Sequence, residues 1–157
     1  MFIDGKIDDV VVNELKKYSD DRGWLMELFR HDELAEEYYP VMTYISMTNP
    51  GVARGPHEHV DQADYFCFAG PSDFKLYLWD SRESSATYKN RMVILAGVSS
   101  PTAVIVPKGV VHAYKNVGNE GGLVINAPNR LFMGTGKAEA VDEIRHEELE
   151  NSPYILD

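Results

Sequence analysis

The sequence predicts an all-β sandwich or jelly roll, and two features of the 157-residue chain support this prediction. Short apolar runs rich in β-branched and aromatic residues recur along the chain, and they match the length of strands better than that of helices. Clusters of proline and glycine separate these runs, because both residues set the backbone angles of turns and interrupt strand pairing. About eight short strands at spacings of roughly 8–14 residues are typical of sandwiches and jelly rolls.

The expected strands follow one another along the chain. They centre on Val10–Val12, Trp24–Met26, Tyr44–Ile45, Tyr65–Phe68, Leu76–Trp79, Met92–Leu95, Val104–Val106 and Leu123–Ile125. The turns between them are expected at Asn49–Gly51, Gly70–Asp73, Ser99–Pro101 and Gly118–Gly122. Because aromatic residues on strands usually pack in a core, the interior of the barrel is expected to hold Tyr44, Tyr65, Tyr77 and Tyr114.

Two segments depart from the strand pattern and predict short helices, one N-terminal and one C-terminal. The first is His31–Tyr38, which ends shortly before a proline, a residue that cannot continue a helix. The second is Ala138–Glu150, an acidic segment whose apolar residues Val141, Ile144 and Leu149 fit the inner face of an amphipathic helix.

Length and composition narrow the classes of function. The chain fits a single domain over residues 1–157, without repeats or linkers. Its net charge of −10 repels nucleic acid and anionic membranes, so neither is expected as a partner. No apolar run approaches the ~18 residues that a membrane span needs. The single cysteine, Cys67, and an N-terminus without the layout of a signal peptide predict a cytoplasmic protein.

Three histidines and one aspartate form the main candidate site. His57 and His59 are two residues apart, so on a strand their side chains share one face. Asp64 follows after enough residues for a tight turn, and His112 begins a later apolar run. Imidazoles and a carboxylate are the ligands of zinc, iron, manganese or nickel, although a lone histidine is more often a surface or hydrogen-bonded core residue.

Both histidine segments resemble the paired motifs of the cupin superfamily, which implies a double-stranded β-helix, or jelly roll. The residues that match the two motifs are Gly51, His57, His59 and Asp64, then Pro107, Gly109, His112 and Asn116. Asp64 stands where glutamate is usual, and the leading glycine of the second motif is missing. Many cupins use these positions without a metal.

Within the cupins, the chain resembles the dTDP-4-dehydrorhamnose 3,5-epimerases over most of its length. Four stretches carry this resemblance in the right order: Asp21–Phe29, Arg54–His57, Asp80–Tyr88 and Val106–Tyr114. The resemblance implies an isomerase or epimerase that removes a proton alpha to the carbonyl of a keto sugar, and it implies that this sugar is nucleotide-linked.

The resemblance also assigns roles to single residues. His57 matches the catalytic base, and an imidazole suits this task because its ordinary pKa of ~6.5 lies near neutral pH. A carboxylate near the C-terminus orients the base in the family; Glu147 or Glu148 fits, and Glu147 is preferred. The motif arginines Arg22 and Arg54 match residues that bind the nucleotide diphosphate, which a guanidinium can hold with two hydrogen bonds.

Three further residues fall within the matched stretches and are expected to bind substrate. They are Glu27 of the first stretch, and His112 and Tyr114 of the last. The N-terminal strand that carries Arg22 reaches the active site of the partner subunit in the family, so the resemblance implies a homodimer.

The chain departs from the family at three catalytic positions. Asp64 stands near the place of a lysine that stabilises the enolate, and His59 replaces a glutamine. The family's catalytic tyrosine falls where this chain has Ile125 and Asn126. Exchanging a lysine for two potential metal ligands predicts that one divalent ion, held by His57, His59, Asp64 and His112, supplies the missing positive charge.

The two roles of His57 exclude each other, because a metal occupies the lone pair that a base needs. Either His57 is the base, or it is a ligand and another group is the base. Two other classes of function also stay open: a metal-dependent cupin such as an oxygenase or a sugar-acid isomerase, and a cupin that binds a sugar without turnover.

Overall fold

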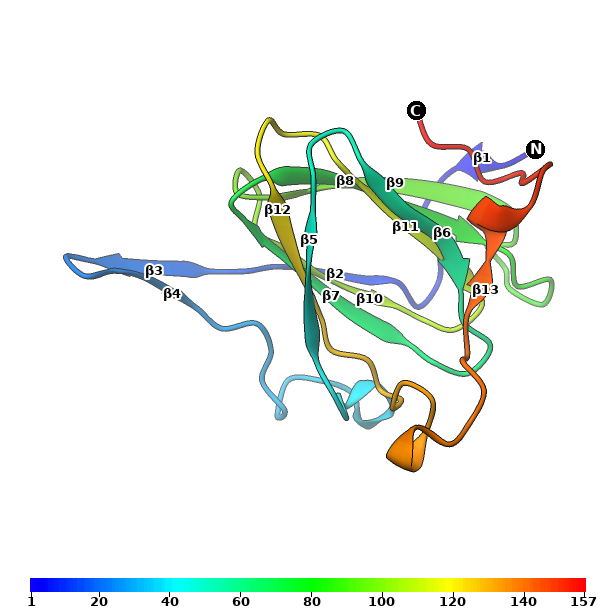
Figure 1. Cartoon of the computed structure of the whole chain (residues 1–157), viewed down its shortest axis with the longest axis horizontal. Helices are drawn as coiled ribbons and strands as arrows, with labels where there is room; N and C mark the ends of the chain where they lie inside the picture. The colour runs from blue at the N-terminus through cyan, green and yellow to red at the C-terminus, as the bar shows by residue number, and fades with distance from the viewer.

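Two β-sheets face each other in the structure, a computed structural model that describes residues 1–157 (Figure 1). One sheet has six strands in the order β1-β9-β8-β11-β6-β13. These strands are β1 (Ile3–Asp4), β9 (Asn90–Gly97), β8 (Asp73–Asp80), β11 (Val110–Asn116), β6 (Ala53–Glu58) and β13 (Ile144–Arg145). The other sheet has the order β2-β10-β7-β12-β5. Its strands are β2 (Val11–Glu14), β10 (Thr102–Val106), β7 (Asp64–Gly70), β12 (Gly122–Asn126) and β5 (Tyr44–Thr48).

This arrangement confirms the predicted all-β jelly roll. Sequence neighbours such as β6 and β7 lie in opposite sheets, while β6 pairs with the distant β11 and β7 with the distant β10 and β12. Apart from the parallel β1–β9 pair, all strand pairs are antiparallel. The chain contains no helix long and apolar enough to cross a membrane.

The core lies between the sheets and follows the two-residue repeat of the strands. Phe66 and Phe68 of β7 belong to the inner cluster together with Leu76 and Leu78 of β8. The other members of this cluster are Ile7, Phe74, Ala96, Val104, Val106, Val110, Tyr114 and Val124. Burial of large aromatic and aliphatic side chains from both sheets provides most of the driving force for folding.

Part of the outer face of each sheet is also covered. Tyr65 of β7 belongs to a cluster that residues of the N-terminal segment, such as Leu28, cover. Tyr77 of β8 belongs to a second cluster that the two chain ends cover. Of the four tyrosines expected inside the barrel, only Tyr114 is in the inner cluster. The prediction was wrong for Tyr65 and Tyr77 because their strands are buried on both faces, so an aromatic residue does not identify the inner face. It was also wrong for Tyr44, which is 46% exposed and lines a cavity outside the core.

A two-stranded hairpin extends away from the barrel (Figure 1). It consists of β3 (Lys17–Asp20) and β4 (Gly23–Met26), which pair only with each other. Its side chains are largely exposed, including the aromatic ring of Trp24 and the aliphatic side chain of Leu25. An isolated two-stranded ribbon with exposed apolar residues is marginally stable in water, so this hairpin is suited to packing against another surface.

Neither predicted helix forms. In the segment His31–Tyr38 only Glu36–Tyr38 makes a single 3₁₀ turn. In the segment Ala138–Glu150 the chain forms β13 and a second 3₁₀ turn at His146–Glu148. The C-terminal prediction was wrong because a short helix is marginal by itself, and pairing of β13 with β6 replaces its internal hydrogen bonds.

Candidate active site

The site is built around the paired strands β6 and β11. His57 of β6 lies directly opposite His112 of β11, so both enter the same region of the barrel. Gly55, two residues before His57, has a φ of +87°, and a Cβ there would lie 2.6 Å from the carbonyl oxygen of His112. Glycine at position 55 therefore allows the close approach of β6 and β11 beside the two histidines.

Glutamates from the C-terminal segment flank the His57 ring on both nitrogens. The Nε2 atom lies 2.6 Å from Oε1 of Glu147, and the Nδ1 atom lies 3.3 Å from Oε1 of Glu143. The side chain of His57 is about one-fifth exposed. Glu147 accepts the hydrogen bond of one nitrogen, which fixes the orientation of the ring and stabilises an imidazolium when a proton arrives.

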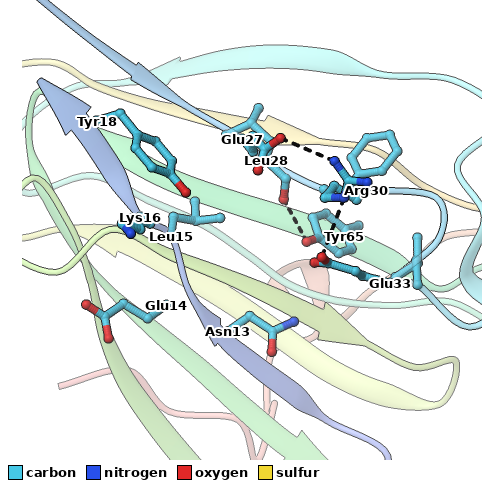
Figure 2. Close-up of a pocket in the computed structure, with 12 residues that line it drawn as sticks. Asn13, Glu14, Leu15, Lys16, Tyr18, Glu27, Leu28, Arg30, Glu33 and Tyr65 are labelled. Carbon is cyan, nitrogen blue, oxygen red and sulfur yellow. Dashed lines mark hydrogen bonds and ion pairs between the residues drawn. The ribbon is translucent and has the colours of Figure 1, made fainter.

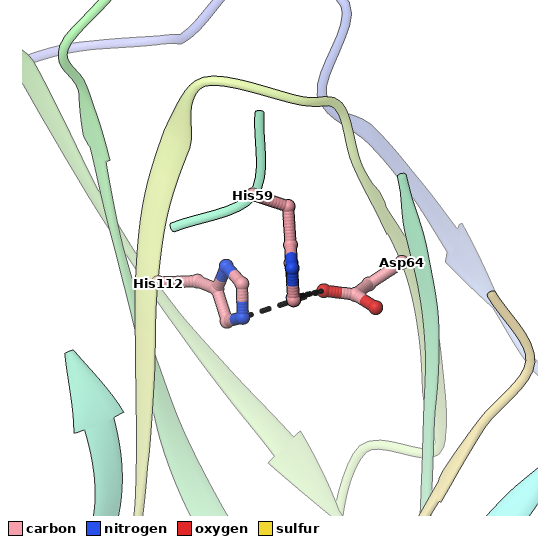
Figure 3. Close-up of side chains that lie close together, drawn as sticks. All are labelled: His59, Asp64 and His112. Carbon is pink, nitrogen blue, oxygen red and sulfur yellow. Dashed lines mark ion pairs between the residues drawn. The ribbon is translucent and has the colours of Figure 1, made fainter. Parts of the chain in front are cut away.

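A second group, formed by His59, Asp64 and His112, joins the two sheets (Figure 3). The Nε2 atoms of both imidazoles face Oδ2 of Asp64, at 3.2 Å from His59 and 3.4 Å from His112. Their Nδ1 atoms face backbone carbonyl oxygens, of Asp142 for His59 and of Val110 for His112. One ligand atom of each side chain lies within 4.8 Å of the others, which is close enough to surround a cation.

Burial and charge shift the pKa values of this group in opposite directions. Burial lowers the pKa of His112 to about 4, and the charge of Asp64 opposes this only in part. Burial also disfavours the charged form of His59, but the hydrogen bond and charge of Asp64 outweigh it and raise its pKa to about 9. Burial raises the pKa of Asp64, whereas the contacts with His59 and His112 lower it below its usual range, and these contacts prevail. Asp64 and His59 are therefore a charged pair at neutral pH, whereas His112 is neutral.

Two amide side chains hold the other oxygen of Asp64. Oδ1 accepts hydrogen bonds from Nδ2 of Asn126 at 2.7 Å and from Nε2 of Gln62 at 2.8 Å. Asn126 also donates to the hydroxyl of Tyr44 at 3.0 Å and accepts from the backbone N–H of Tyr65 at 3.1 Å. With Oδ1 fully occupied, Oδ2 is the oxygen left for the histidines or for a cation.

A cavity of about 1140 Å³ adjoins this group. His59, Tyr44 and Glu143 are among the residues that line it, together with Arg130 and Arg145. Its volume is sufficient for a ligand the size of a sugar nucleotide. Glu143, which lies 3.3 Å from His57, connects the cavity with the candidate base. The two lining arginines are paired with lining carboxylates, Arg130 with Asp61 and Arg145 with Glu143, each at 2.8 Å.

Two other residues predicted to bind substrate, Arg54 of β6 and Tyr114 of β11, are paired across these two strands. Arg54 donates from Nε to the hydroxyl of Thr48 at 3.0 Å and from Nη2 to the carbonyl oxygen of Met47 at 2.9 Å. The ring of Tyr114 packs in the core, and its hydroxyl lies 3.0 Å from that of Ser46. Both side chains are therefore held by β5 rather than by His57.

The remaining two predicted residues, Arg22 and Glu27, are not brought to His57. Arg22 lies in the turn of the exposed β3–β4 hairpin, and its side chain is 90% exposed. Glu27 lines a different pocket, of about 450 Å³, under that hairpin (Figure 2). There its Oε1 pairs with Nη1 of Arg30 at 3.7 Å. Within a single subunit these two residues cannot contact a ligand that lies on His57.

The sequence pattern did not reveal Glu143, Asp142 or Gln62. Glu143 and Asp142 lie in the segment expected to be helical, where their direction could not be inferred. Gln62 lies in the turn between β6 and β7, and its position between His59 and Asp64 was the only available signal. The structure also separates His57 from the group of possible metal ligands, which consists of His59, Asp64 and His112 alone.

Comparisons with known proteins give the chain a family. A sequence model described as dTDP-4-dehydrorhamnose 3,5-epimerase matches residues 4–128. The chain is 38% identical over 128 residues to the "Probable low-salt glycan biosynthesis epimerase Agl13" of Haloferax volcanii. The aligned residues cover 80% of this chain and 81% of that protein. It is also 38% identical over 112 residues to the spore coat polysaccharide biosynthesis protein SpsL of Bacillus subtilis, which covers 71% of this chain and 73% of that protein.

A solved structure supports the same fold. The dTDP sugar isomerase of Desulfovibrio desulfuricans G20 superposes with a TM-score of 0.80 at 18% identity, over 95% of this chain and 89% of that one. Its low identity supports the architecture alone, whereas the family match and the two relatives establish descent. The chain belongs to the dTDP-4-dehydrorhamnose 3,5-epimerase family.

Proposed function

We propose that this member of the epimerase family acts on a nucleotide-linked keto sugar, with His57 as the base and Glu147 as its orienting carboxylate. The observation that carries the proposal is the 2.6 Å contact between His57 Nε2 and Glu147 Oε1, with the cavity-lining Glu143 3.3 Å from the other ring nitrogen. Family membership supports this function over an oxygenase or a sugar-binding protein without turnover.

The proton moves from a carbon alpha to the sugar carbonyl onto Nδ1 of His57, so the substrate has to displace Glu143, which lies 3.3 Å from this nitrogen. Glu147 accepts the Nε2–H bond, which leaves the lone pair on Nδ1, on the side of the cavity-lining Glu143. The products of this step are an enolate and an imidazolium, and the carboxylate of Glu147 stabilises the imidazolium. Transfer of a proton from solvent to the opposite face of the carbon gives the epimer, and His57 releases the proton that it removed to solvent.

Exchange of substrate hydrogens in deuterated water tests this proposal. The protein is incubated with dTDP-4-keto-6-deoxyglucose, and deuterium at C3 and C5 is followed by NMR. Exchange at either carbon by the wild type, and its loss in His57→Asn, is the expected result. Binding of the sugar nucleotide without exchange at either carbon would overturn the proposed chemistry.

We also infer a site for one divalent ion, because the residues present fit one. Two Nε2 atoms and one carboxylate oxygen from His59, His112 and Asp64 are a suitable ligand set, and the Nδ1–H groups are held by backbone carbonyls as in metal-bound histidines. A bound divalent ion would supply positive charge beside the enolate. Since His57 is outside this set, it can act as the base whether or not an ion is bound.

Elemental analysis tests the ion independently of the base. Protein purified without added metal is compared with His59→Ala by mass spectrometry of metals. About one divalent ion per chain in the wild type, lost in the variant, is expected. Full activity of protein that has been freed of metal would exclude a role for the ion in the reaction and leave the proposal for His57 intact.

We also infer a cytoplasmic homodimer in which the β3–β4 hairpin packs against the partner. The exposed Trp24 and Leu25 and the remote position of Arg22 support this, because Arg22 lies outside the cavity of its own subunit. Arg22 is then available to the diphosphate in the partner's site, as the family resemblance implies. The single, buried Cys67 is compatible with the reducing cytoplasm.

Sedimentation analysis tests the dimer. The wild type is expected to sediment at twice the mass of the chain, and Leu25→Glu is expected to shift it towards the monomer. A monomeric wild type at micromolar concentration would exclude the dimer.

A further inference from the structure

Two imidazole–carboxylate pairs connect β6 with the C-terminal segment. In the first pair β6 provides the histidine, and in the second it provides the carboxylate. His57 of β6 contacts Glu147, while its neighbour Glu58 contacts His146, with 2.8 Å between His146 Nε2 and Glu58 Oε2. Adjacent residues of a strand point to opposite faces, so the two pairs lie on opposite sides of β6. The first pair faces the proposed active site and the second faces away from it.

The second pair is firmly held by the body of the protein. The other oxygen of Glu58 accepts a hydrogen bond from the hydroxyl of Ser81 at 3.1 Å, and this hydroxyl is also 2.7 Å from the carbonyl oxygen of Gly109. The ring of His146 packs edge-to-face against Tyr154, with 4.6 Å between ring centroids. The side chain of His146 is 12% exposed. Glu58 and His146 therefore form a fixed contact rather than a solvated surface pair.

Apart from the pairing of β13 with β6, the segment that carries Glu147 has few other attachments. Its apolar residues Val141, Ile144 and Leu149 are 42–55% exposed, so none of them is buried in the core. Within Ala138–Glu150 only Asp142, Glu143 and His146 are more than superficially buried.

The 3₁₀ turn at His146–Glu148 lacks a side-chain cap. Of the half-buried residues, Asp142 binds the β6–β7 turn and Glu143 contacts the base itself. His146 is thus the side-chain anchor next to Glu147.

We infer that Glu58 and His146 are positioning residues that hold the carboxylate of Glu147 against His57. This inference rests on the proposed function, in which His57 is the base, and it adds a pair that touches neither substrate nor reacting atoms. Loss of the Glu58–His146 contact frees the turn and lets Glu147 move away from the imidazole. A displacement of about 1 Å at such a group can cost up to ~100-fold in rate.

Two variants of His146 separate its hydrogen bond from its packing. His146→Phe keeps a ring against Tyr154 but loses the donor to Glu58, whereas His146→Gln keeps a donor and loses the ring. With the sugar nucleotide as substrate, His146→Phe is expected to lower kcat about tenfold at unchanged KM, and His146→Gln to retain most of the activity. His31→Phe is the matched control, because His31 also stacks on a tyrosine, Tyr39, and lies in an exposed loop.

A double variant shows whether His146 acts through Glu147. In a Glu147→Gln background, where no carboxylate is left to position, His146→Phe is expected to cause no further loss of kcat. An equal tenfold loss in both backgrounds would overturn the inference, because it would mean that His146 acts on the fold in general. Equal kcat values for His146→Phe and the wild type would overturn it as well.

The NMR signal of the His57 imidazole N–H gives a readout that does not depend on activity. The hydrogen bond to Glu147 shifts this proton downfield, and the shift is expected to decrease in His146→Phe as it does in Glu147→Gln. An unchanged signal in a folded His146→Phe protein would refute the positioning role. If the wild type shows this shift and its loss in His146→Phe but exchanges no substrate hydrogens, the proposed function fails while the positioning contact stands.

Discussion

His57 and His112 lie directly opposite each other across the β6–β11 ladder, yet their rings belong to different hydrogen-bonded groups. The ring centroids are 6.3 Å apart and the rings are nearly perpendicular, at 89°. His57 contacts Glu147, and His112 contacts the buried Asp64. A single pair of strands thus places the candidate base beside a buried group of two imidazoles and one carboxylate, the group that could hold a cation.

The first prediction concerns the carboxylate that orients the base. Glu147→Gln is expected to lower kcat about 100-fold, because the amide is neutral and cannot stabilise the imidazolium of His57. Glu148→Gln is the matched control, since the neighbouring Glu148 is 68% exposed and its only ion pair, with Arg145, spans 3.8 Å. Steady-state kinetics of the two variants decide between the glutamates. A larger loss in Glu148→Gln would reverse the assignment.

The second prediction concerns the support of Asp64. Asn126→Leu removes the 2.7 Å hydrogen bond to the buried carboxylate and the acceptor for the backbone N–H of Tyr65. Because a buried carboxylate without its donor is costly, the free energy of unfolding is expected to fall by about 3 kcal/mol. Urea unfolding measures this loss, with the exposed Asn119→Leu as the control. A change below 1 kcal/mol would mean that Asn126 contributes little to holding Asp64.

The strand framework and the histidine group were accessible from the sequence because both follow from local rules. The two-residue repeat places His57 and His59 near one face, and the short loop to β7 returns Asp64 towards them. The turn before β11 brings His112 to the same region. Even so, the repeat could not show that the His57 ring would contact glutamates instead of joining the other three side chains.

The C-terminal segment was not predictable, because its conformation depends on contacts that are distant in sequence. Ile144 pairs with Glu58, and Asp142 binds the backbone of residues about 80 positions away. The spacing of Val141, Ile144 and Leu149 among charged residues fits a helix. On a helix Glu143 and Glu147, four residues apart, would share one face, but nothing in the local pattern shows that this face meets His57. Family resemblance could therefore suggest Glu147 as a partner of the candidate base but could not place it, and it gave no sign of Glu143.

The third prediction concerns the anchor of that segment. The carboxylate of Asp142 accepts hydrogen bonds from the backbone N–H groups of Val60, Asp61 and Gln62, at 2.8, 2.9 and 2.8 Å. Asp142→Ala is expected to lower the free energy of unfolding by about 2 kcal/mol and to accelerate hydrogen exchange of these three amides. Glu150→Ala, at an exposed position of the same segment, is expected to change neither. Unchanged exchange in Asp142→Ala would show that the turn holds its shape without the carboxylate.

The last prediction concerns Asp80, which organises the loop after β8. Its buried carboxylate accepts hydrogen bonds from Arg82 at 2.9 Å, Ser85 at 2.7 Å and Thr87 at 2.6 Å. Burial raises the pKa of Asp80, but the hydrogen bonds from Arg82, Thr87 and Ser85 outweigh it and lower the pKa to about 2. Because the folded state binds the proton less readily than the unfolded state, the charged form stabilises the fold at neutral pH.

This stabilisation is fully present above the ordinary aspartate pKa of about 4 and disappears as the pH falls towards 2. Asp80→Asn is therefore expected to lower the free energy of unfolding by roughly 2 kcal/mol at pH 7, and the difference from the wild type is expected to shrink between pH 4 and pH 2. Urea unfolding at a series of pH values measures this convergence, with the exposed Asp21→Asn as a control that shows no such trend. A difference that stays constant down to pH 2 would mean that the loop depends on the shape of residue 80 rather than on its charge.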